Sequence, residues 1–180
     1  NVDLLSVSGH KVHAPKGIGA LYIKSGTEIE NFIFGGSQER SRRAGTENVA
    51  GIVGFSKAID ILRDSREKNV SKRFALREYF LKILNENFSR FNINGSLENR
   101  YSGNINISFP EVDKEMLIMS MDFRGICISG GSACSSGAVE KSHVLDAMGI
   151  EEELKNSAVR ISFGENNTFE EIDEFILALK

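Results

Sequence analysis

Four short segments of the sequence combine residue types that could carry out chemistry, and the first is Ser8-Gly9-His10-Lys11, which follows an apolar run. A lysine that ends a buried strand is partly removed from water, which lowers its pKa and frees the amine for Schiff-base chemistry with a carbonyl group. Ser8 and His10 could donate hydrogen bonds to a phosphate, so the segment could hold a phosphorylated aldehyde. The alternative is a surface lysine that follows a strand.

The second segment, residues 35–48, is polar, holds three glycines and leads into an expected helix. Glycines expose backbone N–H groups, Arg43 adds a positive charge and Thr46 lies just before the helix, so the segment could bind a phosphate. Thr46 could instead serve only as the helix N-cap. The segment lacks the Gly-Lys-Ser/Thr ending of a nucleotide-binding phosphate loop, which disfavours nucleotide binding.

The third segment, residues 129–137, consists of small residues around Cys134. A thiol on an accessible loop can ionise and react as a nucleophile, although Cys134 could equally be an incidental loop thiol. Cys127, between Ile126 and Ile128, is predicted to be a buried small hydrophobic residue.

The fourth feature is Arg160, within the apolar run at residues 158–163. An arginine inside an apolar strand needs an anionic partner, because an unpaired buried charge is costly. Its guanidinium can hold a carboxylate through two parallel hydrogen bonds. The alternatives are an ion pair with the acids at residues 151–153 or an edge-strand arginine that faces water.

Two apolar runs, residues 2–7 and 18–23, predict strands on either side of the lysine segment. The first is apolar at nearly every position, as in a strand buried on both faces of an α/β sheet. Such a strand needs neighbours, and without them it exposes an apolar patch that favours self-association. A helix is expected from residue 49, and the charged residues 63–73 form either a turn or the solvated part of one long helix.

After residue 91 the pattern changes to short strands and helices, and the pair Thr168 and Glu171 predicts a capping box at the last helix. We therefore predict an α/β chain in which residues 1–62 belong to a larger domain, residues 63–90 form a linking helix and residues 91–180 form a small α/β domain. The expected strands of the second part are residues 91–93, 104–109, 126–128 and 158–163, and its expected helices lie near residues 116–120, at 142–148 and from 168 onward.

The 180 residues have an ordinary globular composition, with 41% hydrophobic and 26% charged residues and a formal net charge of -3. Nucleic acid is not expected as a partner, because phosphate backbones are bound by clustered Lys and Arg. No apolar run reaches the roughly 20 residues of a membrane span and no secretory signal opens the chain, so cytoplasmic residence is predicted. The two cysteines are expected to be free thiols. No metal site is predicted, since His13 and His143 belong to no cluster.

Together, these segments resemble the cysteine desulfurases, a pyridoxal-phosphate-dependent family of aminotransferase class V, over essentially the whole chain. Residues 8–11 with 15–19 resemble the cofactor-lysine segment, residues 43–46 the phosphate loop and residues 132–134 the catalytic cysteine loop. The resemblance implies part of the large domain of the fold-type I pyridoxal-phosphate transferases and a small carboxyl-terminal α/β domain.

By this resemblance, Lys11 would bind pyridoxal 5'-phosphate and move protons during the reaction. Ser8 and His10 would bind the cofactor phosphate. Thr46 would reach the phosphate in the other subunit of a homodimer.

The resemblance also assigns the substrate side of the site. Arg160 would hold the carboxylate of L-cysteine, and Cys134 would take the substrate sulfur as a persulfide, leaving L-alanine. The Ser-Ala-Cys-Ser-Ser sequence is similar to that of the cysteine desulfurases with a long mobile loop, which supply iron–sulfur cluster scaffolds and sulfur-modification enzymes. The sulfur would therefore pass to an acceptor protein such as an iron–sulfur cluster scaffold.

Two positions depart from the family pattern, since Ala14 stands where a glycine is common and Gly130 where a serine is common. The amino-terminal half of the family, which supplies a histidine and an aspartate to the cofactor ring, is not in this sequence. The chain alone is therefore expected to be inactive or nearly so. The alternative functions are a selenocysteine lyase on the same scaffold and a noncatalytic module for dimerisation or partner binding.

Overall fold

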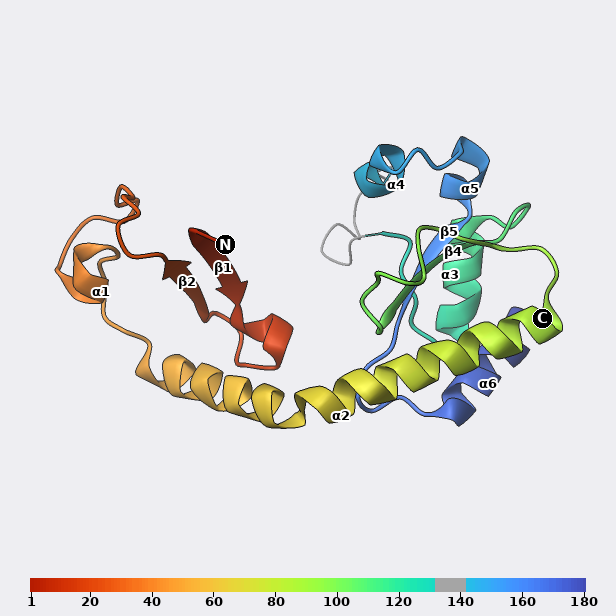
Figure 1. Ribbon diagram of the computed structural model, residues 1–180, viewed down its shortest axis with the longest axis horizontal. Helices are drawn as coiled ribbons and strands as arrows, with labels where there is room; N and C mark the ends of the chain where they lie inside the picture. Colours follow the sequence, from red (N-terminus) through yellow and green to blue (C-terminus); the bar gives the residue numbers. More distant parts are fainter. Residues whose placement is uncertain (132–141) are drawn as a thin grey trace. The chain divides into compact units, whose positions relative to one another are not determined.

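The computed structural model describes residues 1–131 and 142–180, which contain both helices and strands (Figure 1). The described chain forms two compact units, Asn1–Arg66 and Glu67–Lys180, and each has its own sheet. The domain limits expected at residues 62 and 90 stay predictions. No helix in the described part of the chain is long and apolar enough to cross a membrane.

The first unit contains an antiparallel pair of strands, β1 (Leu4–Ser8) and β2 (Gly19–Ile23). Leu4 lies opposite Ile23, and Ser8 lies opposite Gly19. A short 3-10 helix, η1 (Gly9–Val12), follows β1 directly. The two strands expected at residues 2–7 and 18–23 are confirmed.

The first strand is exposed within this chain, as expected for such an apolar strand without its neighbours. Leu4 and Leu5 are 47% and 51% exposed, and Leu21 on β2 is 54% exposed. A sheet of two strands gives neither strand a full set of neighbours, so these apolar side chains stay exposed.

The polar segment at residues 35–48 contains a four-residue helical turn, α1 (Gln38–Ser41), where only a loop was expected. The next helix, α2 (Val49–Asn87), is continuous over 39 residues. Residues 63–73 are therefore part of one long helix, and the alternative of a turn is wrong.

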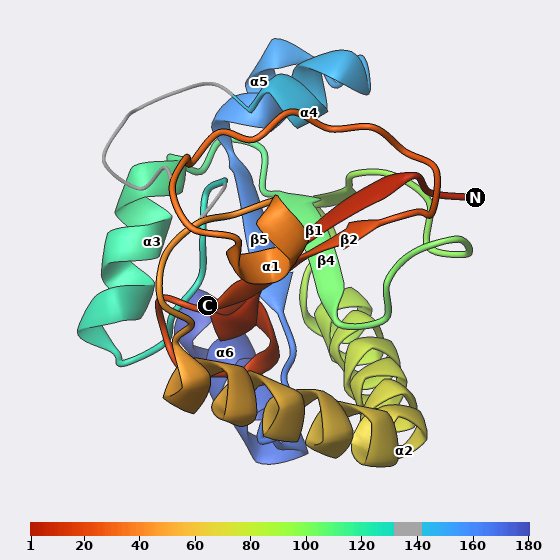
Figure 2. The ribbon, with the colours of Figure 1, turned by 90° about the vertical axis from the view of Figure 1, so that its left-hand side faces the viewer.

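The second unit contains a three-stranded antiparallel sheet in the order β3-β4-β5. Figure 2 shows β4 and β5 of this sheet side by side. The elements of this unit after α2 are β3 (Asn92–Ile93), β4 (Asn104–Ser108), α3 (Lys114–Phe123), α4 (His143–Ala147), α5 (Glu152–Asn156), β5 (Ala158–Ser162) and α6 (Phe169–Leu179).

The core of the second unit lies on one face of this sheet. Alternate side chains of a strand point to opposite faces, and the isoleucines of β4 and the valine and isoleucine of β5 are buried at every second position. Ser108 and Ala158, at the ends of the paired segments, are buried as well. The isoleucines and the valine pack with apolar side chains of α2, α3 and α6. The core residues are Leu76, Phe80, Leu84, Ile105, Ile107, Phe109, Leu117, Met121, Val159, Ile161, Phe163, Ile172, Phe175 and Ile176.

The local predictions for this unit are mostly confirmed. The capping box of α6 is present, since Glu171 N donates to Thr168 Oγ1 at 3.3 Å and Thr168 N donates to Glu171 Oε2 at 3.1 Å. The strand expected at residues 126–128 is wrong, because only Ser129 forms an isolated bridge to β5. Helix α5 was not expected from the sequence.

Candidate active site

Lys11 lies in a tight turn at the end of β1. Gly9 is buried, and its N–H donates to Ile18 O at 2.9 Å. A Cβ atom at position 9 would lie 2.7 Å from Ile18 Cγ2, so the close packing of the turn requires glycine there. His10 and Lys11 follow in η1, and both are exposed. The turn therefore presents Ser8, His10 and Lys11 together.

The predicted partial burial of Lys11 is wrong, because its side chain is exposed within the first unit. The expectation assumed a buried first strand, and the two-stranded sheet does not provide one. The exposed amine remains accessible to a carbonyl compound, but the argument from burial no longer supports its reactivity.

Two side chains hold the loop that precedes Thr46. Gln38 Oε1 accepts a hydrogen bond from Gly45 N at 3.2 Å, and Asn31 Nδ2 donates to Ser41 O at 2.5 Å. Neither contact was predicted, because no local sequence pattern indicates a hydrogen bond across seven or ten positions.

These contacts accompany an unusual backbone conformation. Glu39, Arg40 and Ser41 have φ angles of 50°, 58° and 62°. The left-handed conformation costs roughly 1–2 kcal/mol for each residue that is not glycine. Such a conformation persists only where its surroundings hold it, and the hydrogen bonds from Gln38 and Asn31 contribute to this.

Thr46 is exposed and does not cap α2. Asn48 Oδ1 accepts a hydrogen bond from Gly51 N at 3.1 Å, so Asn48 is the N-cap and the N-cap alternative for Thr46 is wrong. Ser8, His10 and Lys11 lie on one turn, whereas Thr46 lies on a separate loop of the same unit.

Arg160 lies in the middle of β5, in the second unit. Its cross-strand neighbour on β4 is Asn106. On its other side, Ser129 N donates to Arg160 O at 3.2 Å and Arg160 N donates to Ser129 O at 2.6 Å. The arginine is half-buried. Strand β5 is the last strand in the order β3-β4-β5, and among the described residues only the isolated bridge to Ser129 pairs with Arg160 on that side, so the alternative of an edge-strand arginine stays open.

The alternative of an ion pair with residues 151–153 is also not found among the described residues. Glu152 pairs with Lys155 at 2.8 Å. Arg160 forms no salt bridge with another described residue.

A buried asparagine connects the strands beside Arg160. Asn94 is fully buried, and its Nδ2 donates to Asn106 Oδ1 at 2.7 Å and to Ser108 Oγ at 2.8 Å. Ser108 Oγ in turn donates to Leu154 O at 2.7 Å. This network fixes Asn106, the neighbour of Arg160, and nothing in the sequence singled out Asn94.

Cys134 lies outside the described residues, so its role stays a prediction. Ser129, which pairs with Arg160, lies five positions before it. The predicted burial of Cys127 is wrong, because Cys127 is exposed while Ile126 and Ile128 are half-buried. In an extended segment alternate side chains point to opposite sides, which turns Cys127 outward when its neighbours face inward.

Among residues 1–131 and 142–180, no cluster of His, Cys, Asp and Glu side chains could hold a metal ion.

The chain belongs to the aminotransferase class-V family, whose model matches residues 1–175. It is 45% identical over 172 residues to the cysteine desulfurase IscS of Dictyoglomus turgidum, covering 96% of this chain and 44% of that protein. It is 43% identical over 173 residues to the putative cysteine desulfurase IscS 1 of Bacillus subtilis, covering 96% of this chain and 46% of that protein. The chain thus spans less than half the length of these relatives.

Similar solved structures support the fold class. A NifS-like protein from Rickettsia africae has a TM-score of 0.86 and 34% identity, with 99% of this chain and 46% of that chain covered. Another NifS-like protein has a TM-score of 0.85 and 35% identity, with 98% of this chain and 45% of that chain covered. The α/β fold class predicted from the sequence is confirmed.

Proposed function

We propose that this chain forms part of a pyridoxal-phosphate-dependent cysteine desulfurase that converts L-cysteine to L-alanine and keeps the sulfur as a persulfide. The observation that carries the proposal is the turn at the end of β1, which presents Ser8, His10 and Lys11 together. Membership of aminotransferase class V and the names of the relatives support it.

The residues of this turn fit pyridoxal phosphate. The exposed amine of Lys11 can reach an aldehyde, and the hydroxyl of Ser8 and the imidazole of His10 can donate hydrogen bonds to a phosphate. Thr46 would add a hydroxyl from the second subunit of a homodimer. The cofactor, when bound, supplies an electron sink for charge that develops on the substrate carbon.

The chain's own residues would bind and orient the substrate. Arg160 would hold the carboxylate of cysteine with its guanidinium fork, and the backbone pairing of β5 with β4 and Ser129 keeps that residue in place. Lys11 would carry a proton between its amine and the substrate carbon.

Cys134 would be the sulfur acceptor. Its thiolate attacks the sulfur of cysteine, the carbon–sulfur bond breaks, and the carbon takes up a proton to give alanine. The persulfide on Cys134 would then pass its outer sulfur to an acceptor protein, such as an iron–sulfur cluster scaffold. We also propose the cytoplasm as the compartment of this reaction.

The direct test is the site of sulfur labelling. A form of the protein that turns over cysteine is incubated with pyridoxal phosphate and sulfur-labelled cysteine, and its peptides are mapped without reduction. We expect label on Cys134 and a matching amount of alanine, and we expect the 180-residue chain alone to form little or no alanine.

Cys127 provides the matched control, because it is the second cysteine and is exposed. Cys127→Ser should keep the label and the alanine, whereas Cys134→Ser should lose both. Alanine formation that continues undiminished in Cys134→Ser would contradict the proposed role of Cys134.

The selenocysteine lyase alternative is separated by comparing sulfide and selenide release from the two substrates. A noncatalytic module would release neither, even in a complete form that dimerises. The presence of Lys11, Cys134 and Arg160 favours catalysis, since a binding module does not need all three.

A further inference from the structure

Three arginines of the second unit lie near one another. Arg73 contacts the ring of Tyr101, the residue that follows Arg100, and the charge of Arg77 acts on Arg100. Arg73 and Arg77 lie on α2, and Arg100 lies on the loop between β3 and β4. We call these three residues the arginine cluster. Arg77 is only 5% exposed, and the other two are half-buried. Burial of three like charges is costly unless anions compensate them.

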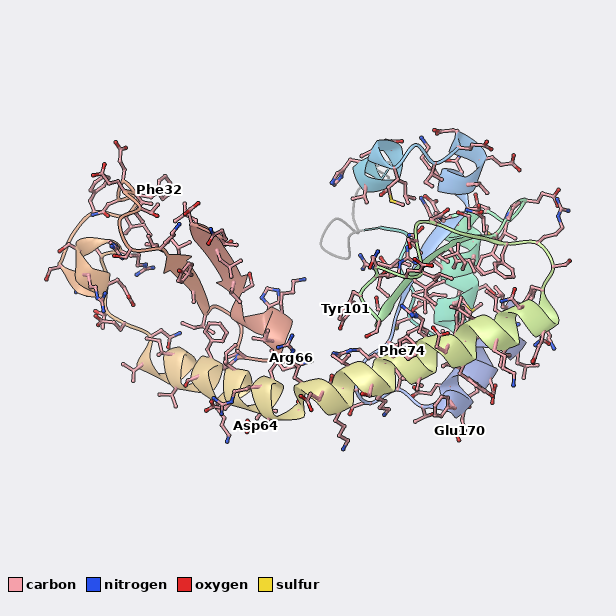
Figure 3. All side chains as sticks on the ribbon, viewed as in Figure 1. Phe32, Asp64, Arg66, Phe74, Tyr101 and Glu170 are labelled. Atoms are coloured by element: carbon pink, nitrogen blue, oxygen red, sulfur yellow. The ribbon has the colours of Figure 1, made fainter. Side chains whose placement is uncertain are left out.

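Aromatic rings fix two of the guanidinium groups. The Arg73 guanidinium lies 5.4 Å from the centre of the Tyr101 ring, and the Arg77 guanidinium lies 5.0 Å from that of Phe74. Figure 3 labels both rings, Phe74 on α2 and Tyr101 on the loop. Contacts between a guanidinium and a ring face hold the group in a defined orientation but supply no negative charge.

The backbone also leaves space for these side chains. A Cβ atom at Gly103 would lie 2.7 Å from Arg73 Cδ, and one at Gly95 would lie 2.9 Å from Arg100 Nη2. The loop between β3 and β4 therefore packs closely around the arginine cluster at two glycines.

Few hydrogen-bond acceptors contact the N–H donors of the arginine cluster. Arg77 Nε and Nη2 donate to Glu78 Oε1 at 3.1 and 3.0 Å, and Glu78 is half exposed. Arg100 Nη2 donates to the carbonyl oxygen of Asn94. In the part of the chain that the structure describes, the buried atoms Arg73 Nε and Arg100 Nη1 have no hydrogen-bond partner.

The charges are also unbalanced. Glu78 is the one carboxylate paired with the three guanidinium groups among the described residues. Burial and the charge of Arg77 lower the pKa of Arg100, so the surroundings of Arg100 disfavour its charged form. Buried N–H donors in native proteins nearly always find an acceptor.

We propose that the arginine cluster is a binding site for an oxyanion, a carboxylate or phosphate group that accepts hydrogen bonds from Arg73 and Arg100. A guanidinium fork matches the paired oxygens of such a group. The oxyanion could be a free small anion or a carboxylate on a polypeptide segment, and both share the same recognition chemistry. The site does not depend on the proposed function.

The test measures thermal unfolding of the 180-residue chain with sodium phosphate, sodium acetate or sodium chloride at equal ionic strength. Phosphate or acetate should raise the Tm by about 3–6 °C over chloride at tenfold excess over its Kd. Arg73→Lys and Arg100→Lys keep the charge and most of the stem but lose the fork, so each should weaken binding about tenfold.

Arg90→Lys is the matched control, because Arg90 is exposed and pairs with Glu111 at 2.8 Å on the surface of the same unit. It should keep the full anion response. The proposal is overturned if phosphate and acetate act no differently from chloride, or if the responses of Arg73→Lys and Arg100→Lys equal that of the unaltered chain.

A second readout covers the case in which a variant fails to fold. The Nε–H signal of Arg73 in the NMR spectrum of the unaltered chain should shift saturably with phosphate or acetate, and an unchanged signal overturns the proposal. A peptide with blocked ends and one glutamate separates the two sources of the oxyanion. If the peptide binds more tightly than acetate, the ligand is a carboxylate on a polypeptide. If it binds equally or more weakly, the ligand is a free anion.

Discussion

Arg160 is held through its backbone on both sides, by β4 and by Ser129, while its side chain forms no salt bridge with the described residues. Strand pairing fixes the backbone of Arg160 and does not occupy its guanidinium group, which can bind a ligand. A half-buried arginine with this arrangement suits a substrate carboxylate, because part of its hydration is already removed before the ligand binds.

The carboxylate-binding role proposed for Arg160 makes a prediction about kinetics. Arg160→Lys keeps the charge but loses the bidentate fork, so the KM for cysteine should rise about 10- to 100-fold, in line with hydrogen bonds to charged groups worth roughly 1.5–3 kcal/mol. Steady-state alanine formation measures it in a form of the protein that turns over cysteine. Arg124→Lys, at an exposed arginine of the same unit, is the control, and an equal rise in KM there would contradict the role.

For single residues, the sequence predicted which side chains matter better than it predicted their burial and their contacts. Arg160 was singled out because it interrupts an apolar strand, and the structure places it within β5. The burial expected for Lys11 and Cys127 was wrong, because burial depends on neighbours that are distant in the sequence. Asn94 and Gln38 were missed for the same reason, since their hydrogen bonds reach across 7 to 14 positions.

The elements of the second unit are tied together by the network around Asn94, which joins β4 to the segment after β3. Asn94→Ala removes the donor to Asn106 and Ser108 and opens a polar gap. We expect a loss of about 2–4 kcal/mol in the free energy of unfolding, measured by urea denaturation. Asn87→Ala, at an exposed asparagine on α2, should stay within about 0.5 kcal/mol, and equal losses in the two variants would refute the role of the network.

The capping box of α6 makes a prediction about pH. A hydrogen bond from the Asn167 side chain, with one from the backbone N–H of Thr168, lowers the pKa of Glu171. A lowered carboxyl pKa stabilises the folded state above the unfolded value of about 4.3, and this stabilisation is lost as the pH falls through the folded value. Glu171→Gln keeps the cap without the charge.

The stability difference between the unaltered chain and Glu171→Gln should therefore be present at neutral pH and shrink as the pH falls below about 4.3 and through the lowered pKa of Glu171 in the folded chain. Chemical denaturation at a series of pH values measures it. Glu174→Gln, on the same helix, is the control, and a difference that stays constant over this pH range would show that the charge of Glu171 does not stabilise the cap.

Elements were predictable where one local signal dominated. The alternating apolar residues of β4 and the Thr168–Glu171 pair each indicated the right structure. Helix α1 was missed because its residues take left-handed φ angles without glycine. The strand expected at residues 126–128 was wrong because only Ser129 reaches a partner on β5.

The two units of the molecule differ in how they are stabilised. The buried apolar side chains described in the first unit are those of Ala14, Ala44 and Ala58, which bury little area. The second unit has a core of large side chains from a sheet and three helices. Since hydrophobic stabilisation grows with apolar area buried, the turn around Lys11 depends mainly on backbone hydrogen bonds and on the packing of Gly9.

The central claim is that Lys11 binds the cofactor. The most direct measurement is borohydride reduction of the 180-residue chain in the presence of pyridoxal phosphate, followed by peptide mapping of the modified lysines. We expect modification at Lys11 that is lost in the Lys11→Ala variant. Lys16 is also exposed, so Lys16→Ala is the control and should keep the modification. Modification spread evenly over exposed lysines and unchanged by Lys11→Ala would contradict the claim.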